Sequence, residues 1–166
     1  MRFKWLAAVA ALAFIGQASA QDAKTPALVY DLGGKFDKSF NEAAYNGAER
    51  FKAETGVEYR EFEIQNESQR EQALRNFARR GYSPIIAMSF SQQAPLEKVA
   101  AEFPDIQFAI VDAVVDLPNV RSIVFREEQG SYLVGVLAAM ASKTGKIGFV
   151  GGMDIPLIRR FACGYV

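Results

Sequence analysis

Short apolar segments that end in a polar residue recur along this chain, and each is followed by a stretch with helical spacing. The clearest of them run from Ala27 to Asp31, from Pro84 to Met88 and from Ile106 to Asp112. Strands that are apolar on both faces are typical of a parallel sheet covered by helices. The alternation therefore predicts an α/β fold, a parallel sheet with helices on both faces.

The segments between these strands have the periodicity of amphipathic helices. From Phe40 to Phe51, apolar or small residues recur at i, i+3, i+4, i+7, i+8 and i+11, which places them on one helical face. The further helices that we expect are 67–80, 93–103, 128–142 and one beginning near Pro156, and the further strands are 58–64, 120–125 and 146–150.

Polar residues stand at the ends of the apolar strands. Asp31, Ser89 and Asp112 each follow or finish such a strand. Right-handed crossovers put the carboxyl ends of parallel strands on one edge of the sheet, where α/β proteins bind their ligands. We therefore expect these three residues to share one edge.

The segment 31–41, Asp-Leu-Gly-Gly-Lys-Phe-Asp-Lys-Ser-Phe-Asn, joins the first strand to the first helix. Its glycines let a ligand approach the backbone, and the helix start offers unpaired N–H groups. Asp31, Phe40 and Asn41 supply a carboxylate, an aromatic face and an amide. This combination suits a neutral, flat, polar ligand better than a phosphate.

The first twenty residues have the pattern of a secretory signal peptide. Arg2 and Lys4 precede an apolar run from Trp5 to Ile15, and Ala18-Ser19-Ala20 forms a small-residue cleavage site. The apolar run is too short to span a bilayer. No cysteine stands at the expected new N-terminus, Gln21, so we expect a periplasmic protein without a lipid anchor.

Composition narrows the chemistry further. The chain has no histidine and one cysteine, Cys163, which excludes zinc sites built from His and Cys clusters and triads that use histidine. Basic and acidic residues are equal in number, and removal of the signal peptide leaves a slight acidic excess. Nothing in this balance favours a nucleic-acid partner.

Alternative interpretations were weighed for several motifs. Gly33-Gly34-Lys35 lacks the P-loop pattern, and Gly148 to Gly152 lacks the dinucleotide-binding fingerprint. A secreted hydrolase could instead use Asp31, Asp37 and Asp112 with a divalent ion. A periplasmic ligand sensor that feeds a signalling receptor is a further alternative.

Each candidate residue also has a structural interpretation. Asp31 and Asp112 could cap the elements that follow them, and Phe40 could be the first core residue of its helix. Ser39 is expected to be the helix cap. Cys163 is expected to be a small buried residue.

Motifs in four regions resemble the basic membrane protein (BMP) family of ABC-transporter substrate-binding proteins. They are 31–47, 108–112, 127–135 and 147–156, and they occur in the order found in that family. The resemblance covers nearly the whole chain after the signal peptide. It implies a type I periplasmic binding fold, in which two Rossmann-like or flavodoxin-like lobes close on a ligand.

The resemblance also implies a division of the chain. Residues 21–125 would form the N-terminal lobe, and 126–166 the hinge crossing and the incomplete start of the second lobe. Family members are considerably longer, so we expect much of the second lobe to be missing and ligand affinity to be weak.

The family implies a purine nucleoside receptor for an ABC importer, with permease and ATPase subunits as partners. It implies no enzymatic activity, no cofactor and no metal. Asp31 and Asn41 would hydrogen-bond the ligand, and Phe40 would stack on the purine. Ser89 and Phe90 would line the floor of the cleft, and Asp112 would accept hydrogen bonds from the base or the ribose.

Overall fold

A computed structural model describes residues 24–166, so the expected signal peptide, residues 1–20, lies outside the described part. The elements, in chain order, are β1 (Ala27–Tyr30), α1 (Phe40–Thr55), β2 (Arg60–Glu63), α2 (Gln69–Arg79), β3 (Ile85–Met88), the short 3-10 helix η1 (Phe90–Gln92), α3 (Gln93–Glu102), β4 (Phe108–Val111), β5 (Val120–Ile123), α4 (Glu127–Ala141) and α5 (Pro156–Tyr165).

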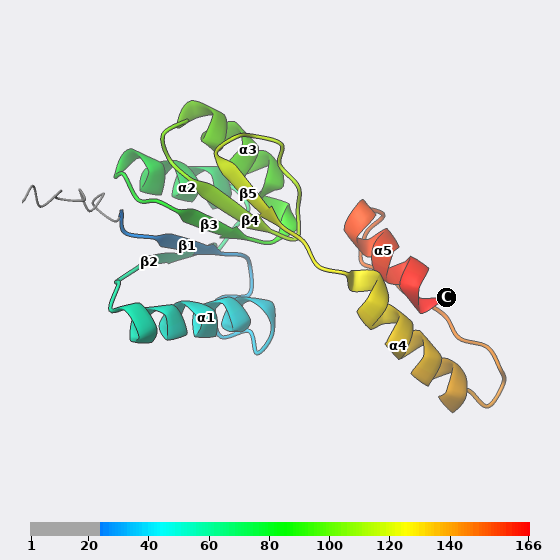
Figure 1. The fold of residues 1–166 in the computed structure, drawn as a ribbon. Helices are drawn as coiled ribbons and strands as arrows, with labels where there is room; N and C mark the ends of the chain where they lie inside the picture. The colour runs from blue at the N-terminus through cyan, green and yellow to red at the C-terminus, as the bar shows by residue number, and fades with distance from the viewer. Residues whose placement is uncertain (1–23) are drawn as a thin grey trace, which may run out of the picture.

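The sheet has five strands in the order β2-β1-β3-β4-β5, and every neighbouring pair is parallel. The α/β prediction is therefore confirmed. The chain steps from β1 to β2 in one direction and then from β2 past β1 to β3 in the other. Right-handed connections in opposite directions put α1 on one face and α2 and α3 on the other, as Figure 1 shows.

Alternating side chains of β1 explain why both faces of the sheet are apolar. Ala27 and Val29 join the large core that contains α2 and α3, whereas Leu28 and Tyr30 join a smaller cluster under α1. All four are buried. A strand buried on both sides has no polar face, which is why the sequence shows a continuous apolar run.

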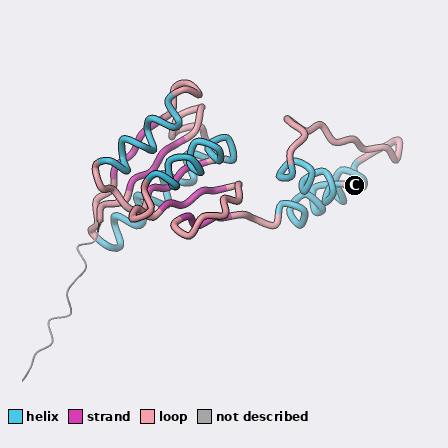
Figure 2. Tube along the Cα trace, turned by 90° about the horizontal axis from the view of Figure 1, so that it is seen from above, coloured by secondary structure: helices cyan, strands magenta, loops and turns pink. Residues whose placement is uncertain are grey.

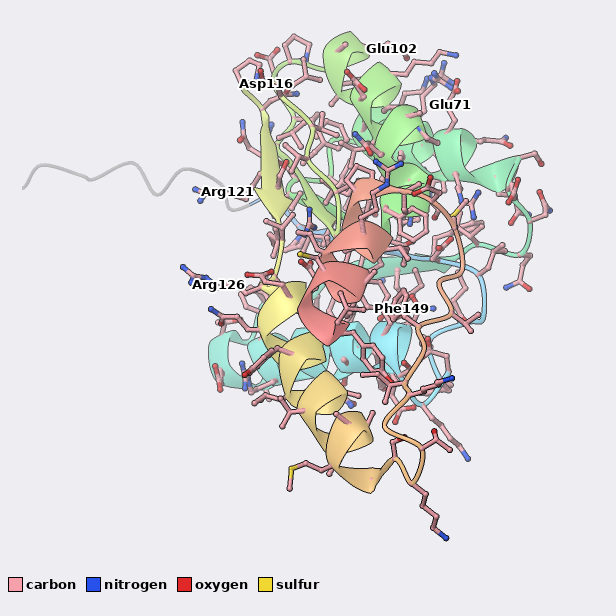
Figure 3. All side chains as sticks on the ribbon, turned by 90° about the vertical axis from the view of Figure 1, so that its right-hand side faces the viewer. Glu71, Glu102, Asp116, Arg121, Arg126 and Phe149 are labelled. Atoms are coloured by element: carbon pink, nitrogen blue, oxygen red, sulfur yellow. The ribbon has the colours of Figure 1, made fainter. Side chains whose placement is uncertain are left out.

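Ion pairs tie the two helices of the larger core together at their surface. Arg75 of α2 lies 2.7 Å from Glu71 on its own helix and 2.7 Å from Glu102 of α3. Figure 3 labels both acids at the same end of the molecule. Exposed pairs of this kind contribute little stability, so the packed apolar side chains dominate this layer.

The last two helices form a separate pair and run in the same general direction, since Glu127 contacts Arg160 and Gly135 lies against Tyr165 near the end of α5. An extended segment, 124–126, leads out of β5 to α4, and α4 lies against α5 beyond the edge of the sheet (Figures 1 and 2). The two helices approach closely at Gly135 and Gly164: a Cβ on Gly135 would overlap the Tyr165 carbonyl, and one on Gly164 would overlap the Glu128 backbone.

Two predictions about this C-terminal region are wrong. Residues 146–150 were expected to form a sixth strand, but they have no regular secondary structure. A strand needs a neighbour for its hydrogen bonds, and in the described part the sheet ends at β5. Cys163 was expected to be buried, but it is exposed.

Among the described residues, no helix combines the length and the apolar character needed to cross a membrane.

The close contact of α4 with α5 predicts opposite effects for two substitutions on the same helix. Gly135→Ala should destabilise the packing of α4 on α5 by about 1–3 kcal/mol, because backbone must move to admit the methyl group. Gly130→Ala meets nothing within 4 Å and should stabilise α4 by about 0.5–1 kcal/mol. Amide hydrogen exchange along α5 should accelerate only in the Gly135 variant. Equal exchange in both variants would contradict this packing.

Candidate ligand-binding site

The loop between β1 and α1 is folded around the side chain of Asn41. Its Oδ1 accepts a hydrogen bond from Asp31 N at 3.1 Å, and its Nδ2 donates to the carbonyls of Asp31 and Gly34, both at 3.2 Å. Only 1% of Asn41 is exposed. The Asn41 side chain therefore shapes the loop from inside, and its predicted contact with a ligand stays a prediction.

Asp37 caps α1. Its carboxylate accepts hydrogen bonds from the backbone N–H groups of Ser39 at 2.8 Å and of Asn41 and Glu42 at 3.1 Å. Desolvation opposes ionisation, but these three donors hold the pKa of Asp37 below its usual value. Ser39 occupies the N-cap position, as predicted, but its side chain makes no capping hydrogen bond. The side chain of Asp37 is longer than that of serine, and its carboxylate accepts hydrogen bonds from three N–H groups at once.

Asp31 stands at the carboxyl end of β1, where the order of the strands reverses between β1 and β3. Ser91 Oγ donates to its Oδ2 at 2.7 Å, and Arg70 Nη2 donates to its Oδ1 at 3.1 Å. Burial alone would raise the pKa of Asp31. Hydrogen bonds from Ser91, the Leu32 backbone, Ser89 and Arg70 outweigh that effect and hold the pKa below its usual value.

Ser89 and Phe90 follow β3. Ser89 has a left-handed backbone with φ of 90°, an uncommon conformation for a residue other than glycine, and its Oγ accepts from Ser91 N at 3.3 Å. Phe90 packs against the core on the side of α2 and α3. Ser89 thus supports Ser91, which holds Asp31. The predicted ligand contacts of Ser89 and Phe90 stay predictions.

Asp112 and Phe40 line one pocket of about 600 Å³ between the sheet edge and the α4–α5 pair. Phe40 is the half-buried first residue of α1, and Asp112 follows β4 with φ of 68°. The other predicted site residues, Asp31, Asn41, Ser89 and Phe90, do not line this pocket. Its other lining residues are Phe125, Glu127, Gly130, Ser131, Val134, Gly148, Phe149, Val150, Phe161 and Tyr165.

The two carboxylates that line this pocket, Asp112 and Glu127, have different surroundings. Burial, with the nearby Glu127 carboxylate, raises the pKa of Asp112, although Arg160 partly opposes the rise. Within the described residues, no side chain or backbone group donates a hydrogen bond to the Asp112 carboxylate. Glu127 is different, because Arg160 Nε donates to it at 2.7 Å. Asp112 is thus the acceptor left free to meet a ligand.

Aromatic side chains of the C-terminal region form another wall. Phe149, labelled in Figure 3, lies in the segment before α5 and contacts Tyr165 with ring centroids 5.8 Å apart. Phe40 at the start of α1 and Phe125 after β5 line the same pocket. A pocket with aromatic walls and one free carboxylate suits a planar ligand that carries N–H or O–H groups.

A larger groove of about 730 Å³ lies between α1 and the sheet. Leu28, Ile86, Met88 and Phe51 are among its lining residues, and it has almost no polar surface. Specific small-molecule sites need a few converging polar groups as well as apolar walls. The smaller pocket beside Asp112 meets that requirement, and the groove does not.

A metal-dependent hydrolase is not favoured by the arrangement of the acids. Asp37 is occupied with the start of α1, and Asp31 is paired with Arg70. Across residues 24–166, no group of three or more His, Cys, Asp or Glu side chains is placed to hold a metal ion.

Sequence reasoning missed Arg70 and Ser91, two of the donors to Asp31. Ser91 lies two residues after Ser89, the polar residue that follows β3, and that position was the available signal. Arg70 gave no such signal, because a basic residue in a charged helix is typical of a solvated surface.

Comparisons with known proteins agree with one another. A sequence model of the family described as Bmp, PnrA-like ABC transporter substrate-binding protein, matches residues 24–166. The ABC transporter nucleoside-binding protein BmpA of Lactococcus lactis is 37% identical over 145 residues, which cover 84% of this chain and 41% of that protein. A CD4+ T-cell-stimulating antigen of Listeria monocytogenes is 37% identical over 147 residues, 85% of this chain and 41% of that protein.

Solved structures show the same likeness. The crystal structure of an ABC transporter solute-binding protein from Aeropyrum pernix K1 superposes with a TM-score of 0.75 at 37% sequence identity, covering 86% of this chain and 41% of that one. This likeness confirms the predicted periplasmic-binding-protein fold. The chain spans about two fifths of the length of the relatives it matches.

The role of Asn41 in the loop predicts a large effect on stability. Asn41→Ala leaves several buried backbone groups unpaired and should lower the free energy of unfolding by about 2–4 kcal/mol. Asn46→Ala, on the exposed side of the same helix, is the matched control and should change stability by less than about 0.5 kcal/mol. Urea unfolding measures both. Equal stability of the two variants would show that the Asn41 bonds do not hold the loop.

Proposed function

Because this chain belongs to the Bmp family of PnrA-like ABC transporter substrate-binding proteins, we propose that it binds a purine nucleoside for uptake by an ABC importer. The site is the pocket between Phe40 and Asp112, with Asp31 on the same sheet edge. The observation that carries the proposal is the free, half-buried Asp112 carboxylate facing an aromatic-lined pocket.

The chemistry of the pocket supports a nucleoside rather than a nucleotide. Phe40 offers an aromatic ring on which a flat base can stack. An ionised carboxylate only accepts hydrogen bonds, so Asp112 suits the N–H edge of a base or the hydroxyls of a sugar. Asp31 and Asp112 would both repel a phosphate. The basic side chain of Arg160, which is near Asp112, is already paired with the Glu127 carboxylate. The nucleoside-binding relative from Lactococcus lactis supports the same choice.

The division of the chain into lobes is part of the proposal. Residues 21–125 form the N-terminal lobe, the chain crosses at 126–129, and 130–166 begin the second lobe. The separate position of the α4–α5 pair supports this division (Figure 1). Leu133, Leu137 and Met140 of α4 are 67–80% exposed, an apolar surface that a complete lobe normally covers.

The cellular setting follows from the family. We propose that residues 1–20 direct export to the periplasm and that no lipid anchor is attached at Gln21. The partners of the complete receptor are then the permease and ATPase subunits of an importer. Solute capture outside the membrane needs neither a cofactor nor catalysis.

The lobe described here is expected to bind weakly. A base stacked on Phe40 contributes about 1–3 kcal/mol, and hydrogen bonds to the two carboxylates about 1.5–3 kcal/mol each. Association and ordering cost about 4–15 kcal/mol. The difference allows at best a dissociation constant in roughly the millimolar range.

Calorimetry with inosine tests the proposed site. The unsubstituted chain should bind inosine weakly and Asp112→Asn should bind roughly tenfold more weakly still, because a charged acceptor is lost. Asp116→Asn, on the exposed loop that follows, is the matched control and should bind like the unsubstituted chain. Because the pKa of Asp112 is raised, affinity should fall on acidification at a higher pH than for an ordinary aspartate.

Chromatography of the same mixtures separates binding from catalysis. Inosine should be recovered intact, with or without calcium or magnesium. Release of free base or ribose would contradict a binding protein, and equal affinity of the Asp112 and Asp116 variants would remove Asp112 from the site.

A further inference from the structure

Arg70 occupies a position that is costly for an arginine. It lies in the first turn of α2, where the helix dipole disfavours a positive charge, and only 8% of it is exposed. Its Nε is buried without a hydrogen-bond partner. A buried cation with an unpaired donor lowers stability unless other contacts compensate. The local structure of α2 gives no reason for an arginine here, so the reason lies in what its guanidinium contacts.

The main contact of Arg70 is the Asp31 carboxylate. Nη2 lies 3.1 Å from Asp31 Oδ1, and the side chains are only 10% and 17% exposed. The other charged group in contact with Arg70 is Glu67 at 3.5 Å, and the Glu67 side chain is 79% exposed. The well-screened Glu67 contributes little, so Asp31 is the effective partner.

A second donor holds Asp31 from another element. Ser91 Oγ, in η1, donates to Asp31 Oδ2 at 2.7 Å. Ser91 is held in turn by Ser89, whose Oγ lies 3.1 Å from Ser91 Oγ and accepts from Ser91 N. The start of α2 and the turn after β3 thus converge on one carboxylate at the end of β1.

We infer that Arg70 is a positioning residue, which together with Ser91 fixes the orientation of the Asp31 carboxylate at the ligand edge of the sheet. Ser89 and the Leu32 backbone add further hydrogen bonds, so the two carboxylate oxygens are acceptors of fixed position. Two acceptors held side by side suit a ligand with two adjacent donors, such as the vicinal hydroxyls of a sugar. The choice of ligand rests on the proposed function, whereas the coupling of Arg70 to Asp31 does not.

The coupling also has a consequence for ionisation. Burial of Asp31 favours its neutral form, which would lose one acceptor and gain a donor. Hydrogen bonds from Ser91, the Leu32 backbone, Ser89 and Arg70 favour the charged form and keep the pKa of Asp31 low. Asp31 therefore stays ionised at acidic pH values at which Asp112, with its raised pKa, takes up a proton.

Substitution of the two donors tests the inference without a ligand. The pKa of Asp31 is followed by carbon-13 NMR of its carboxyl group in the unsubstituted chain, Arg70→Met, Arg70→Lys and Ser91→Ala. Arg75→Met is the matched control, because Arg75 lies on the same helix and pairs with the surface acids Glu71 and Glu102. Circular dichroism confirms folding, and the Lys and Ser91 variants keep the test available if Arg70→Met unfolds.

The Asp31 pKa should rise in Arg70→Met and in Ser91→Ala and stay unchanged in Arg75→Met. In Arg70→Lys it should lie between its values in the unsubstituted chain and in Arg70→Met. In calorimetry, Arg70→Met should bind inosine about tenfold more weakly than Arg75→Met, and its affinity should fall at a higher pH on acidification. Recovery of inosine affinity in Arg70→Lys would distinguish a loss of positioning from a loss of packing.

The two proposals fail in different ways. An Asp31 pKa that does not move in Arg70→Met overturns the role of Arg70, whether or not inosine binds. Equal inosine affinity in Arg70→Met and Arg75→Met overturns it as well. A chain that binds no inosine at all, but whose Asp31 pKa moves as expected, counts against the proposed nucleoside ligand and supports the coupling of Arg70 to Asp31.

Discussion

Parallel pairing of β1 with both β2 and β3 is the constraint on which the rest of this structure depends. It places the strand ends on one edge and reverses the direction of the chain between β1 and β3. Asp31, Ser91 and Asp112 reach that edge from three different strands. None of them is close to another in sequence, so the sheet alone brings them together. A shift in strand register would separate the carboxylates and the pocket would lose its polar groups.

The two carboxylates of the edge have opposite environments. Asp31 is held by Arg70 and Ser91, which favour its charged form, whereas Asp112 is desolvated beside Glu127 and receives no hydrogen bond from the described residues. The difference suits a binding site that uses both carboxylates. The supported group provides fixed geometry, and the free group has most to gain from the donors of a ligand.

Much of the fold could be predicted from the sequence, because a strand buried on both faces reads as an apolar run and an amphipathic helix as a 3.6-residue period. The polar ends of the strands placed Asp31 and Asp112 at the carboxyl edge of the sheet, where the structure has them. Residues 146–150 were misjudged because a strand depends on a neighbour, which no local pattern reveals. The sequence indicated Ser39 as the N-cap, but the first N–H groups of α1 are bound by the side chain of Asp37. Arg70 could not be found, since its partner lies 39 residues away and only the folded sheet unites them.

The central claim is that the carboxyl edge of the sheet at β1, β3 and β4 is the ligand site. Backbone amide NMR during titration with millimolar inosine tests it most directly, since weak binding still shifts the amides that line a site. The account predicts that the largest shifts map to 31–41, 89–91 and 112–113 and to the start of α4. Shifts centred on the groove between α1 and the sheet, or no shifts at all, would contradict it.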